Sequence, residues 1–471
     1  MFDFADIFSK ISHKQITISI LQKKKKKNYV IKKLYNFAFA NESLLNLKLM
    51  GKIKVLHILN RFNLGGPTYY AAYLTKFLPE DFETKLIGGV QDKEEGNSEF
   101  VLQQYGITPI VIDTMHRSIG FNDFAAYKEI KQIIKEYQPD IVHTHAAKAG
   151  MLGRLAAKRC GVKIIIHTFH GHVFDKYFNG LKTHFYKSLE RFLARQSTKI
   201  IALSNLQKYD LVEKYKICRN DKVRVIPLGL DLDQYLEKQD IKRESFRKAY
   251  RIADDEIAIG IIGRLAPIKN HSLFLDAMAL VLQHTHKKIK IFIVGDGDQH
   301  SFIEQKLEQL NLSYANYNSN DSQKQCPDVQ VYLTSWIKEI DIVNAGLDIV
   351  ALTSLNEGTP GSLIEAQAAN KAIVATNVGG VADTVIDGET ALLAESENIE
   401  DVAEKMLRLI EDDKLRAELS SHGAEYVKEK YHYLNLAQNM ADLYRELLTK
   451  QTTDWKTRAR IHKLDIFHLF S

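Results

Sequence analysis

The sequence is poor in cysteine and has no long apolar run, and each absence excludes a class of protein. Its three cysteines, Cys160, Cys218 and Cys326, are odd in number, widely separated and without Cys-x-x-Cys spacing. This usage argues against a disulfide framework or a structural zinc site and fits a reducing cytosol. No apolar stretch approaches the ~18 residues of a membrane-spanning helix. We therefore expect a cytoplasmic protein that at most rests on the inner face of the cytoplasmic membrane.

Excess charge is also missing from most of the chain. The net charge is +6 over 471 residues, but residues 1–49 hold ten lysines, no arginine and three acidic residues, which gives +7. The rest of the chain is nearly neutral, so nothing indicates a nucleic-acid partner. A hydrophobic content of 45% and a charged content of 26% are ordinary for a globular protein, and the length suits two or three domains.

Residues 1–49 form a basic leader with no clear place in the fold. The run Lys23–Lys27 follows the apolar stretch ITISIL, whereas a secretory signal has its positive charge first. One hypothesis is an over-extended reading frame, because Met50-Gly-Lys-Ile-Lys-Val looks like a natural start. The other is a basic membrane tether, worth about 1 kcal/mol per lysine near an anionic bilayer. We favour the first, since the leader lacks glycine turns.

From Met50 onward, strand patterns alternate with helix patterns, for instance the helices predicted at 124–137 and 146–160. Apolar, β-branched runs predict a first series of strands at 52–59, 84–90, 108–112, 140–145, 163–169, 199–204 and 222–228. They predict a second series at 256–263, 288–295, 329–334, 347–354 and 371–377. This alternation predicts two α/β domains, each a Rossmann-like αβα sandwich around a parallel sheet.

The predicted domain boundaries follow from these two series. The first domain is assigned to residues 50–228 and the second to 229–432. Residues 433–450 are predicted to form a C-terminal helix that crosses back to the first domain, with a tail at 451–471. The polar stretch 312–328 is longer than usual for a compact domain and is predicted to be a surface insertion.

The stretch 355–366, LNEGTPGSLIEA, places two glutamates around a Gly-Thr-Pro-Gly turn between a predicted strand and helix. Ligands bind at this carboxyl edge of an open α/β sheet. Glu357 lies in the turn, and Glu365 lies in the helix. Thr359 is predicted to cap the helix, and Pro360 suits its first position.

The start of this helix is a candidate anion site. The amides of Gly361, Ser362 and Leu363 would attract a phosphate, and the missing side chain at Gly361 would let it approach. Glu365, one turn later, would repel phosphate but could accept hydrogen bonds from sugar hydroxyls. An ordinary capped helix with a solvated glutamate remains the alternative.

Two further loops follow predicted strands. In GRLAPIKN, Arg264 and Lys269 follow the strand that ends at Gly263, without a neighbouring acid, and could hold a diphosphate as a fork and a point charge. In NLGGP, Gly65 and Gly66 remove side chains where a backbone could approach a ligand. The plainer alternatives are a solvated basic loop and a tight turn.

Histidines gather at the ends of two predicted strands, His143 and His145 in IVHTHAAKAG and His170 and His172 in HTFHGHVF. Their number suggests a metal site. No carboxylate or cysteine nearby completes a ligand set, so we predict none. Taken singly, each histidine is more often a packed or capping residue.

In this order, the motifs NLGGP, HTHAAKAG, HTFHGHVF, GRLAPIKN, VGDGD and NEGTPGSLIEA resemble those of the GT-B glycosyltransferases. The closer match is to the retaining enzymes of glycosyltransferase family 4, over about residues 52–450. The resemblance implies two Rossmann-like domains facing each other across a cleft. It also implies transfer of a sugar from a nucleotide diphosphate sugar, with a UDP-sugar expected, to an acceptor hydroxyl with retention and without a metal cofactor.

The resemblance also implies roles for individual residues. Arg264 and Lys269 would bind the diphosphate of the donor, and Glu365 would bind its ribose hydroxyls. Glu357 would contact the transferred sugar, and His170 would line the cleft beside it. Two alternatives stay open: a GT-B sugar-nucleotide epimerase, which has no acceptor, and a non-catalytic GT-B partner subunit.

Bacterial proteins with these histidine motifs often build capsule, lipopolysaccharide or other envelope glycans on lipid carriers, which implies a lipid-linked saccharide acceptor. Segment 177–195 fits such a membrane-surface role, because apolar residues share one face of a predicted helix that is otherwise basic. These residues are Phe178, Leu181, Phe185, Leu189 and Phe192. A core-packed helix with solvated lysines is the alternative.

Overall fold

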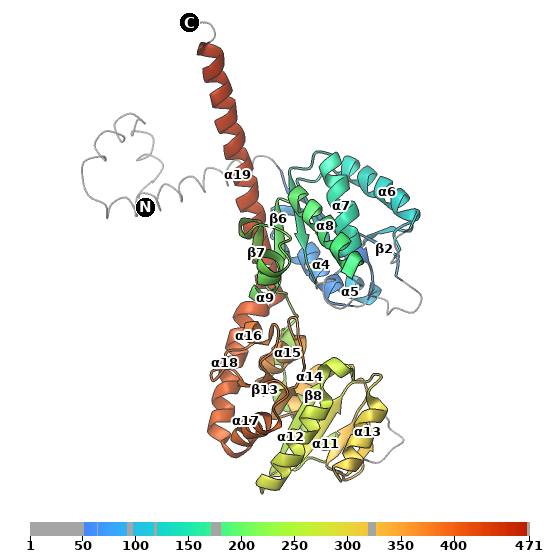
Figure 1. Cartoon of the computed structure of the whole chain (residues 1–471), viewed down its shortest axis with the longest axis vertical. Coiled ribbons are helices and arrows are strands. Elements are labelled where there is room, and N and C mark those ends of the chain that lie inside the picture. The colour runs from blue at the N-terminus through green and yellow to red at the C-terminus, as the bar shows by residue number, and fades with distance from the viewer. Residues whose placement is uncertain are drawn as a thin grey trace, which may run out of the picture. The chain divides into compact units, whose positions relative to one another are not determined.

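The computed structural model describes residues 51–63, 65–91, 98–116, 120–170, 180–318 and 326–468. The basic leader lies outside these residues. Contacts divide the chain into a small unit, made of 1–53, 80–83 and 449–471, and a large unit, made of 54–79 and 84–448. The large unit holds nearly all of two sheets, and Figure 1 shows the strands with helices beside them.

Within the described residues, the first sheet has seven strands in the order β3-β2-β1-β4-β5-β6-β7. They are β1 (Ile53–Arg61), β2 (Phe82–Gly89), β3 (Ile110–Ile112), β4 (Ile141–His145), β5 (Ile164–Thr168), β6 (Lys199–Ala202) and β7 (Val223–Val225). The intervening helices are α4 (Gly66–Phe77), α5 (Glu99–Gln104), α6 (Asn122–Tyr137), α7 (Ala147–Arg159), α8 (Gly180–Gln196) and α9 (Asn205–Tyr209). The strand order reverses between β1 and β4, which pair in parallel.

The second sheet, again counted over the described residues, has seven strands in the order β10-β11-β9-β8-β12-β13-β14. They are β8 (Glu256–Ile262), β9 (Lys288–Val294), β10 (Tyr314–Asn316), β11 (Val331–Leu333), β12 (Ile349–Leu352), β13 (Ala372–Thr376) and β14 (Leu392–Ala394). Its helices are α10 (Asp233–Leu236), α11 (Gln239–Ala249), α12 (His271–His284), α13 (His300–Gln309), α14 (Ile340–Gly346), α15 (Gly361–Ala368), α16 (Val381–Thr384), α17 (Ile399–Glu411) and α18 (Asp413–Tyr431). The last helix is α19 (Tyr433–His468). The order reverses between β8 and β12.

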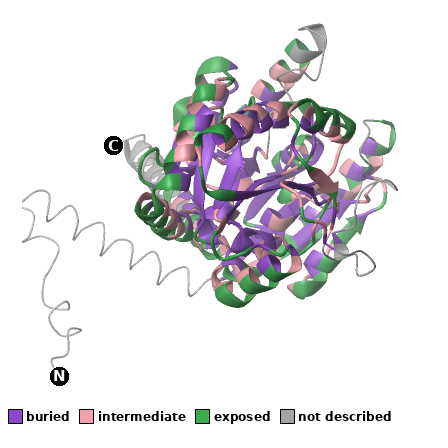
Figure 2. Ribbon diagram, turned by 90° about the horizontal axis from the view of Figure 1, so that it is seen from below, coloured by how far each residue is buried: buried purple, intermediate pink, exposed green. Residues whose placement is uncertain are grey.

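Most strand residues are buried because helices cover both faces of each sheet. Every residue of β4, β5, β12 and β13 is buried, and Figure 2 shows buried strands between helices with exposed outer sides. The predicted GT-B fold class, with two Rossmann-like parallel sheets, is confirmed. Each predicted strand is present, but β10 and β14 were missed. Both are three-residue edge strands that do not lie in a longer apolar run, unlike β3 and β7, which were predicted.

One correction concerns the predicted surface insertion at 312–328. Part of it forms the edge strand β10, which pairs in parallel with β11. The edge position explains the polar composition, because one side of the strand faces solvent. None of the helices in the described part of the chain has the length and apolar character that a membrane span requires.

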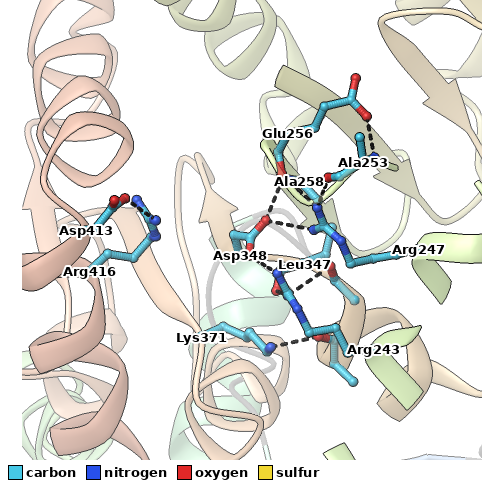
Figure 3. Close-up of polar contacts among 12 residues, drawn as sticks. Arg243, Arg247, Ala253, Glu256, Ala258, Leu347, Asp348, Lys371, Asp413 and Arg416 are labelled. Atoms are coloured by element: carbon cyan, nitrogen blue, oxygen red, sulfur yellow. Dashed lines mark hydrogen bonds and ion pairs between the residues drawn. The ribbon is translucent and has the colours of Figure 1, made fainter. Parts of the chain in front are cut away.

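A polar network holds the amino ends of the strands in the second sheet (Figure 3). Asp348, just before β12, accepts hydrogen bonds from Arg243 at 2.7 Å, from Arg247 at 3.2 Å and from the amide of Ala258 at 2.8 Å. Lys371, just before β13, donates to a backbone carbonyl of α14, and burial lowers its pKa to about 8. The network secures one edge of the sheet and leaves the carboxyl edge for the site.

Candidate active site

The loops after β8 and β12 lie together, because these two strands are neighbours at the point where the strand order reverses. The amide of Leu355 donates to the carbonyl of Ile268 at 2.8 Å. The hydroxyl of Thr353 donates to the carbonyl of Asn270 at 3.1 Å. These bonds fasten the GRLAPIKN loop to the NEGTPG loop at the carboxyl edge of the sheet, where ligands of such folds bind.

Lys269 forms an ion pair with Glu357, with Nζ 2.6 Å from Oε1. The hydroxyl of Ser354 donates to the same oxygen at 2.6 Å. The prediction that Lys269 has no neighbouring acid is therefore wrong, because the acid comes from the loop after the adjacent strand, 88 residues later. The side chains of Lys269 and Glu357 are 23% and 11% exposed, so the pair is partly shielded from water.

A cavity of about 660 Å³ opens beside these loops, a volume within the range of small-molecule sites. It is lined by Arg264, Ala266, Pro267, Ile268, Gly297, Asp298 and Leu355. Arg264 is exposed to solvent at this cavity, so its guanidinium is available to an anionic ligand.

Glycines let the loops at this edge approach one another closely. A Cβ added to Gly295, whose φ is +143°, would lie 1.9 Å from the carbonyl oxygen of Gly263. A Cβ on Gly380 would lie 1.7 Å from the oxygen of Gly358, and the amide of Gly380 donates to the carbonyl of Glu357 at 2.9 Å. Gly380 thus positions the backbone of Glu357. It was missed in the sequence, although the glycine pair NVGG follows a predicted strand.

The helix α15 begins at Gly361 with Pro360 as its N-cap residue and no side-chain capping bond. The prediction that Thr359 caps this helix is therefore wrong, and Pro360 lies outside the helix with ψ near 103°. The amide of Leu363 donates to the carbonyl of Pro360 at 3.2 Å, so it is not free as predicted. The amides of Gly361 and Ser362 belong to the first turn, where helical N–H groups lack intrahelical partners.

Glu365, also on α15, is partly buried and hydrogen-bonded to Tyr235 of α10. Burial raises the pKa of its carboxyl group to about 7 and outweighs the opposite effect of the Tyr235 hydrogen bond. At neutral pH the carboxyl group is thus divided between its charged and neutral forms, and either form can hydrogen-bond a hydroxyl.

The remaining predicted site residues lie beside the first sheet, in segments that follow its strands. Gly65 is the N-cap residue of α4, and a Cβ added to Gly66 would meet nothing within 4 Å, so this loop is open to a ligand. His170 follows β5, and burial lowers its pKa to about 3. Its ring lies edge-on to Tyr70 of α4, with 4.9 Å between centroids. His172 lies outside the described residues.

The structure also places His57 of β1 beside His143 and His145 of β4, a group that could hold a metal ion. The prediction against a metal site considered the pairs in the histidine motifs and overlooked His57. His57 reaches the other two histidines because β1 pairs in parallel with β4, and no sequence pattern predicts that pairing.

Comparison with known proteins decides the family. Residues 64–234 match the family described as Glycosyltransferase Family 4, and residues 242–426 match Glycosyl transferases group 1. The chain is a family 4 glycosyltransferase. The predicted family and the predicted transferase activity are thereby confirmed.

Among its relatives, this glycosyltransferase is 27% identical over 406 residues to the Escherichia coli UDP-Gal:α-D-GlcNAc-diphosphoundecaprenol α-1,3-galactosyltransferase, covering 85% of this chain and 98% of that protein. It is 23% identical to the Staphylococcus aureus capsular polysaccharide biosynthesis glycosyltransferase CapM, and the match covers 74% of this chain and 87% of CapM. Anabaena HepE, solved in complex with UDP, superposes with a TM-score of 0.68 at 18% identity, covering 84% of this chain and all of HepE. HepE shows the same fold.

Proposed function

We propose that this glycosyltransferase transfers a sugar from a UDP-sugar to an acceptor hydroxyl with retention of configuration. The observation that carries the proposal is the grouping of Arg264, the Lys269–Glu357 pair and the start of α15 at one edge of the second sheet. Arg264 lines the cavity, and Lys269 comes from the same loop. UDP in complex with HepE and the UDP-galactose donor of the E. coli relative support the choice of nucleotide.

The cations and the helix start would act on the leaving diphosphate, which gains negative charge as the glycosidic bond breaks. Arg264, Lys269 and the amides of Gly361 and Ser362 would stabilise that charge. One well-aimed donor of this kind typically contributes about 10²–10³ in rate. The ion pair with Glu357 restrains the ammonium group of Lys269, whose remaining N–H groups could donate to a phosphate oxygen.

Glu357 is a poor nucleophile in this arrangement. Its Oε1 accepts from both Lys269 and Ser354 at 2.6 Å, and these two donors lower the reactivity of that oxygen. A front-face substitution, in which the leaving phosphate assists the incoming hydroxyl, therefore suits the site better than a covalent intermediate. Glu357 would bind the transferred sugar, and His170 would line its surroundings.

We further propose a lipid-linked saccharide acceptor at the inner face of the cytoplasmic membrane. The E. coli relative acts on a diphosphoundecaprenol-linked sugar, and CapM serves capsule synthesis. On α8, the rings of Phe185 and Phe192 are 64% and 47% exposed, and Leu189 is half-buried. A wholly core-packed helix does not fit these values. Phe178 and the side chain of Leu181 lie outside the described residues.

The deciding experiment incubates the pure enzyme with a panel of UDP-sugars and lipid-linked acceptors and measures free UDP and the product. Release of UDP that requires the acceptor, with a retained anomer, supports the proposal. An epimerised sugar nucleotide without acceptor would instead indicate an epimerase. UDP binding without turnover on any acceptor would indicate a partner subunit.

The proposal also includes transfer without a metal cofactor, because Arg264 and Lys269 supply positive charge for the diphosphate. Activity should persist in EDTA. Loss of activity that added Mn²⁺ restores would show that a metal ion carries this charge.

A further inference from the structure

Three buried histidines gather on one face of the first sheet, where its strand order reverses. His57 of β1 and His143 of β4 are register partners in the parallel pair. Successive side chains of a strand point to opposite faces, so His145, two residues after His143, lies on the same face. Three imidazoles from two adjacent strands therefore converge without the help of any loop.

One pair of their nitrogens has the separation that a shared metal ion requires, and the third nitrogen lies nearby. A ligand nitrogen from each ring lies within 4.8 Å of the other two. His57 Nδ1 is 3.4 Å from His145 Nε2. Two nitrogens bound to tetrahedral zinc at about 2.0–2.1 Å are about 3.3–3.4 Å apart, which matches this distance. As a hydrogen bond between two imidazoles, the same distance is long.

The chemistry of the rings also fits. All three side chains are fully buried, and a neutral imidazole is the form that binds a metal ion. In addition, His57 Nε2 is buried without a hydrogen-bond partner, and the other nitrogen of the ring makes only the long contact with His145.

Contacts around the group would orient it as a ligand set. His143 is hydrogen-bonded at both ring nitrogens, Nδ1 to the hydroxyl of Tyr444 at 2.6 Å and Nε2 to the hydroxyl of Thr168 at 2.7 Å. A metal ion on Nε2 would displace the Thr168 hydroxyl, and Nδ1 would keep its contact with Tyr444. His145 Nδ1 lies 3.2 Å from His170 Nε2. With a metal on its Nε2, His145 would donate its Nδ1 proton to His170. Such outer contacts fix the tautomer and direction of histidine ligands in metal proteins.

From this convergence we propose that His57, His143 and His145 form a binding site for a borderline transition metal ion, with Zn²⁺ as the expected occupant. Three neutral imidazoles with an open fourth position are a known zinc ligand set. Imidazoles select Zn²⁺, Co²⁺ or Cu²⁺ over Mg²⁺ and Mn²⁺, which prefer oxygen. The site is distinct from the diphosphate-binding residues of the second sheet.

The test titrates the full, untagged, chelator-treated chain with Co²⁺, whose visible absorption is intense in a tetrahedral site, and then with Zn²⁺ against a chromophoric chelator. We expect one tight ion per chain. His57→Asn and His145→Asn should each weaken binding by about 100-fold or more, beyond the loss typical of an outer contact. His167→Asn is the matched control, because His167 is also a buried strand histidine but contacts Thr144, which points to the opposite face.

The absence of a tetrahedral Co²⁺ band, or equal Zn²⁺ affinity in wild type and His57→Asn, would overturn the proposal. Circular dichroism checks that each variant is folded. If the histidine variants fail to fold, Tyr444→Phe removes one outer contact of His143 and should weaken Zn²⁺ binding by about tenfold. Unchanged Zn²⁺ affinity in Tyr444→Phe would then count against the site. Millimolar Mg²⁺ should not displace Zn²⁺.

Discussion

At the scale of single residues, the candidate site depends on charges that tertiary contacts have paired or shielded. Lys269 is bound to Glu357, and Glu365 is partly buried against Tyr235. Neither group behaves as the freely solvated side chain that its sequence neighbours suggest. The chemistry of the donor site is thus set by the partner of each ionisable group.

Lys269→Ala should lower kcat/KM with the UDP-sugar by about 100-fold or more, because one charge-stabilising donor is lost and Glu357 is left without its cation. The measurement is steady-state kinetics, with UDP affinity by calorimetry. Lys288→Ala is the matched control, since Lys288 pairs with Asp255 on the surface and should tolerate the change. A Lys269→Ala enzyme within threefold of wild type would contradict the assignment.

Glu365→Gln should make thermal stability less dependent on pH and abolish most turnover. The carboxyl group has a pKa of about 7 in the folded chain, above its ordinary value. The unfolded chain therefore loses the proton first as pH rises from about 4.5 to 7, and wild-type stability falls over that interval. Glutamine cannot ionise, so the Tm of the variant relative to wild type should rise between pH 5 and pH 8.

Differential scanning calorimetry at the two pH values measures this change. A Tm difference that is the same at pH 5 and pH 8 would show that Glu365 is not held near neutrality. Near-normal kcat/KM in the variant would show that Glu365 does not act in the proposed donor site, whatever the result of the stability test.

At the scale of elements, the site is built from the carboxyl ends of β8, β9 and β12 and the amino end of α15. Because glycine has no side chain, these loops can contact one another closely at Gly295 and Gly380. Glycine serves a different purpose at Gly361, where an added Cβ would meet nothing within 4 Å. Gly295 and Gly380 thus allow close contacts between loops, whereas Gly361 leaves space in front of the first amides of α15.

Gly361→Val should weaken UDP binding by about tenfold or more, ~1.4 kcal/mol, while the fold stays intact. The valine side chain has room in the free protein but would occupy the approach to the first amides of α15. Gly120→Val is the control, because a Cβ there also meets nothing within 4 Å and the residue precedes α6 of the first sheet. Equal UDP affinity in both variants would rule out anion binding at α15.

At the scale of the whole molecule, the proposed lipid-linked acceptor would require a membrane-facing surface as well as a site. The exposed rings of Phe185 and Phe192 are spaced by seven residues along α8, and so share one helical face. The helix itself is secured, since Glu190 forms a buried ion pair with Arg154 of α7 at 2.8 Å. An apolar face on an anchored helix suits the interface of a membrane.

The double variant Phe185→Ser/Phe192→Ser should bind anionic vesicles about tenfold or more weakly, because two apolar rings no longer enter the bilayer. Turnover of a vesicle-borne acceptor should fall with it, whereas turnover of a short soluble acceptor should not. Sedimentation with vesicles and parallel kinetics measure both effects. Phe100→Ser, another exposed aromatic of the first sheet region, is the control. Unchanged vesicle binding in the double variant would place the membrane contact elsewhere.

The sequence by itself determined the two parallel sheets and the strand ends that carry the site. Apolar β-branched runs and turn residues are local signals, so all strands longer than three residues were predictable, as were the short strands β3, β7 and β11. The positions of Arg264, Gly361 and Glu365 after or within recognisable elements were predictable for the same reason. The start of α15 shows the limit of local rules, because Pro360, and not the expected Thr359, precedes the helix.

Only the tertiary structure decided which side chains meet. Lys269 contacts Glu357 because β8 and β12 are adjacent, and His57 joins His143 and His145 because β1 pairs with β4. The reversal of strand order in each sheet brings together residues that are more than 80 positions apart. Burial then raises the pKa of Glu365 and lowers that of His145. Strand neighbours and desolvation are properties of the packed chain, and no local pattern encodes them.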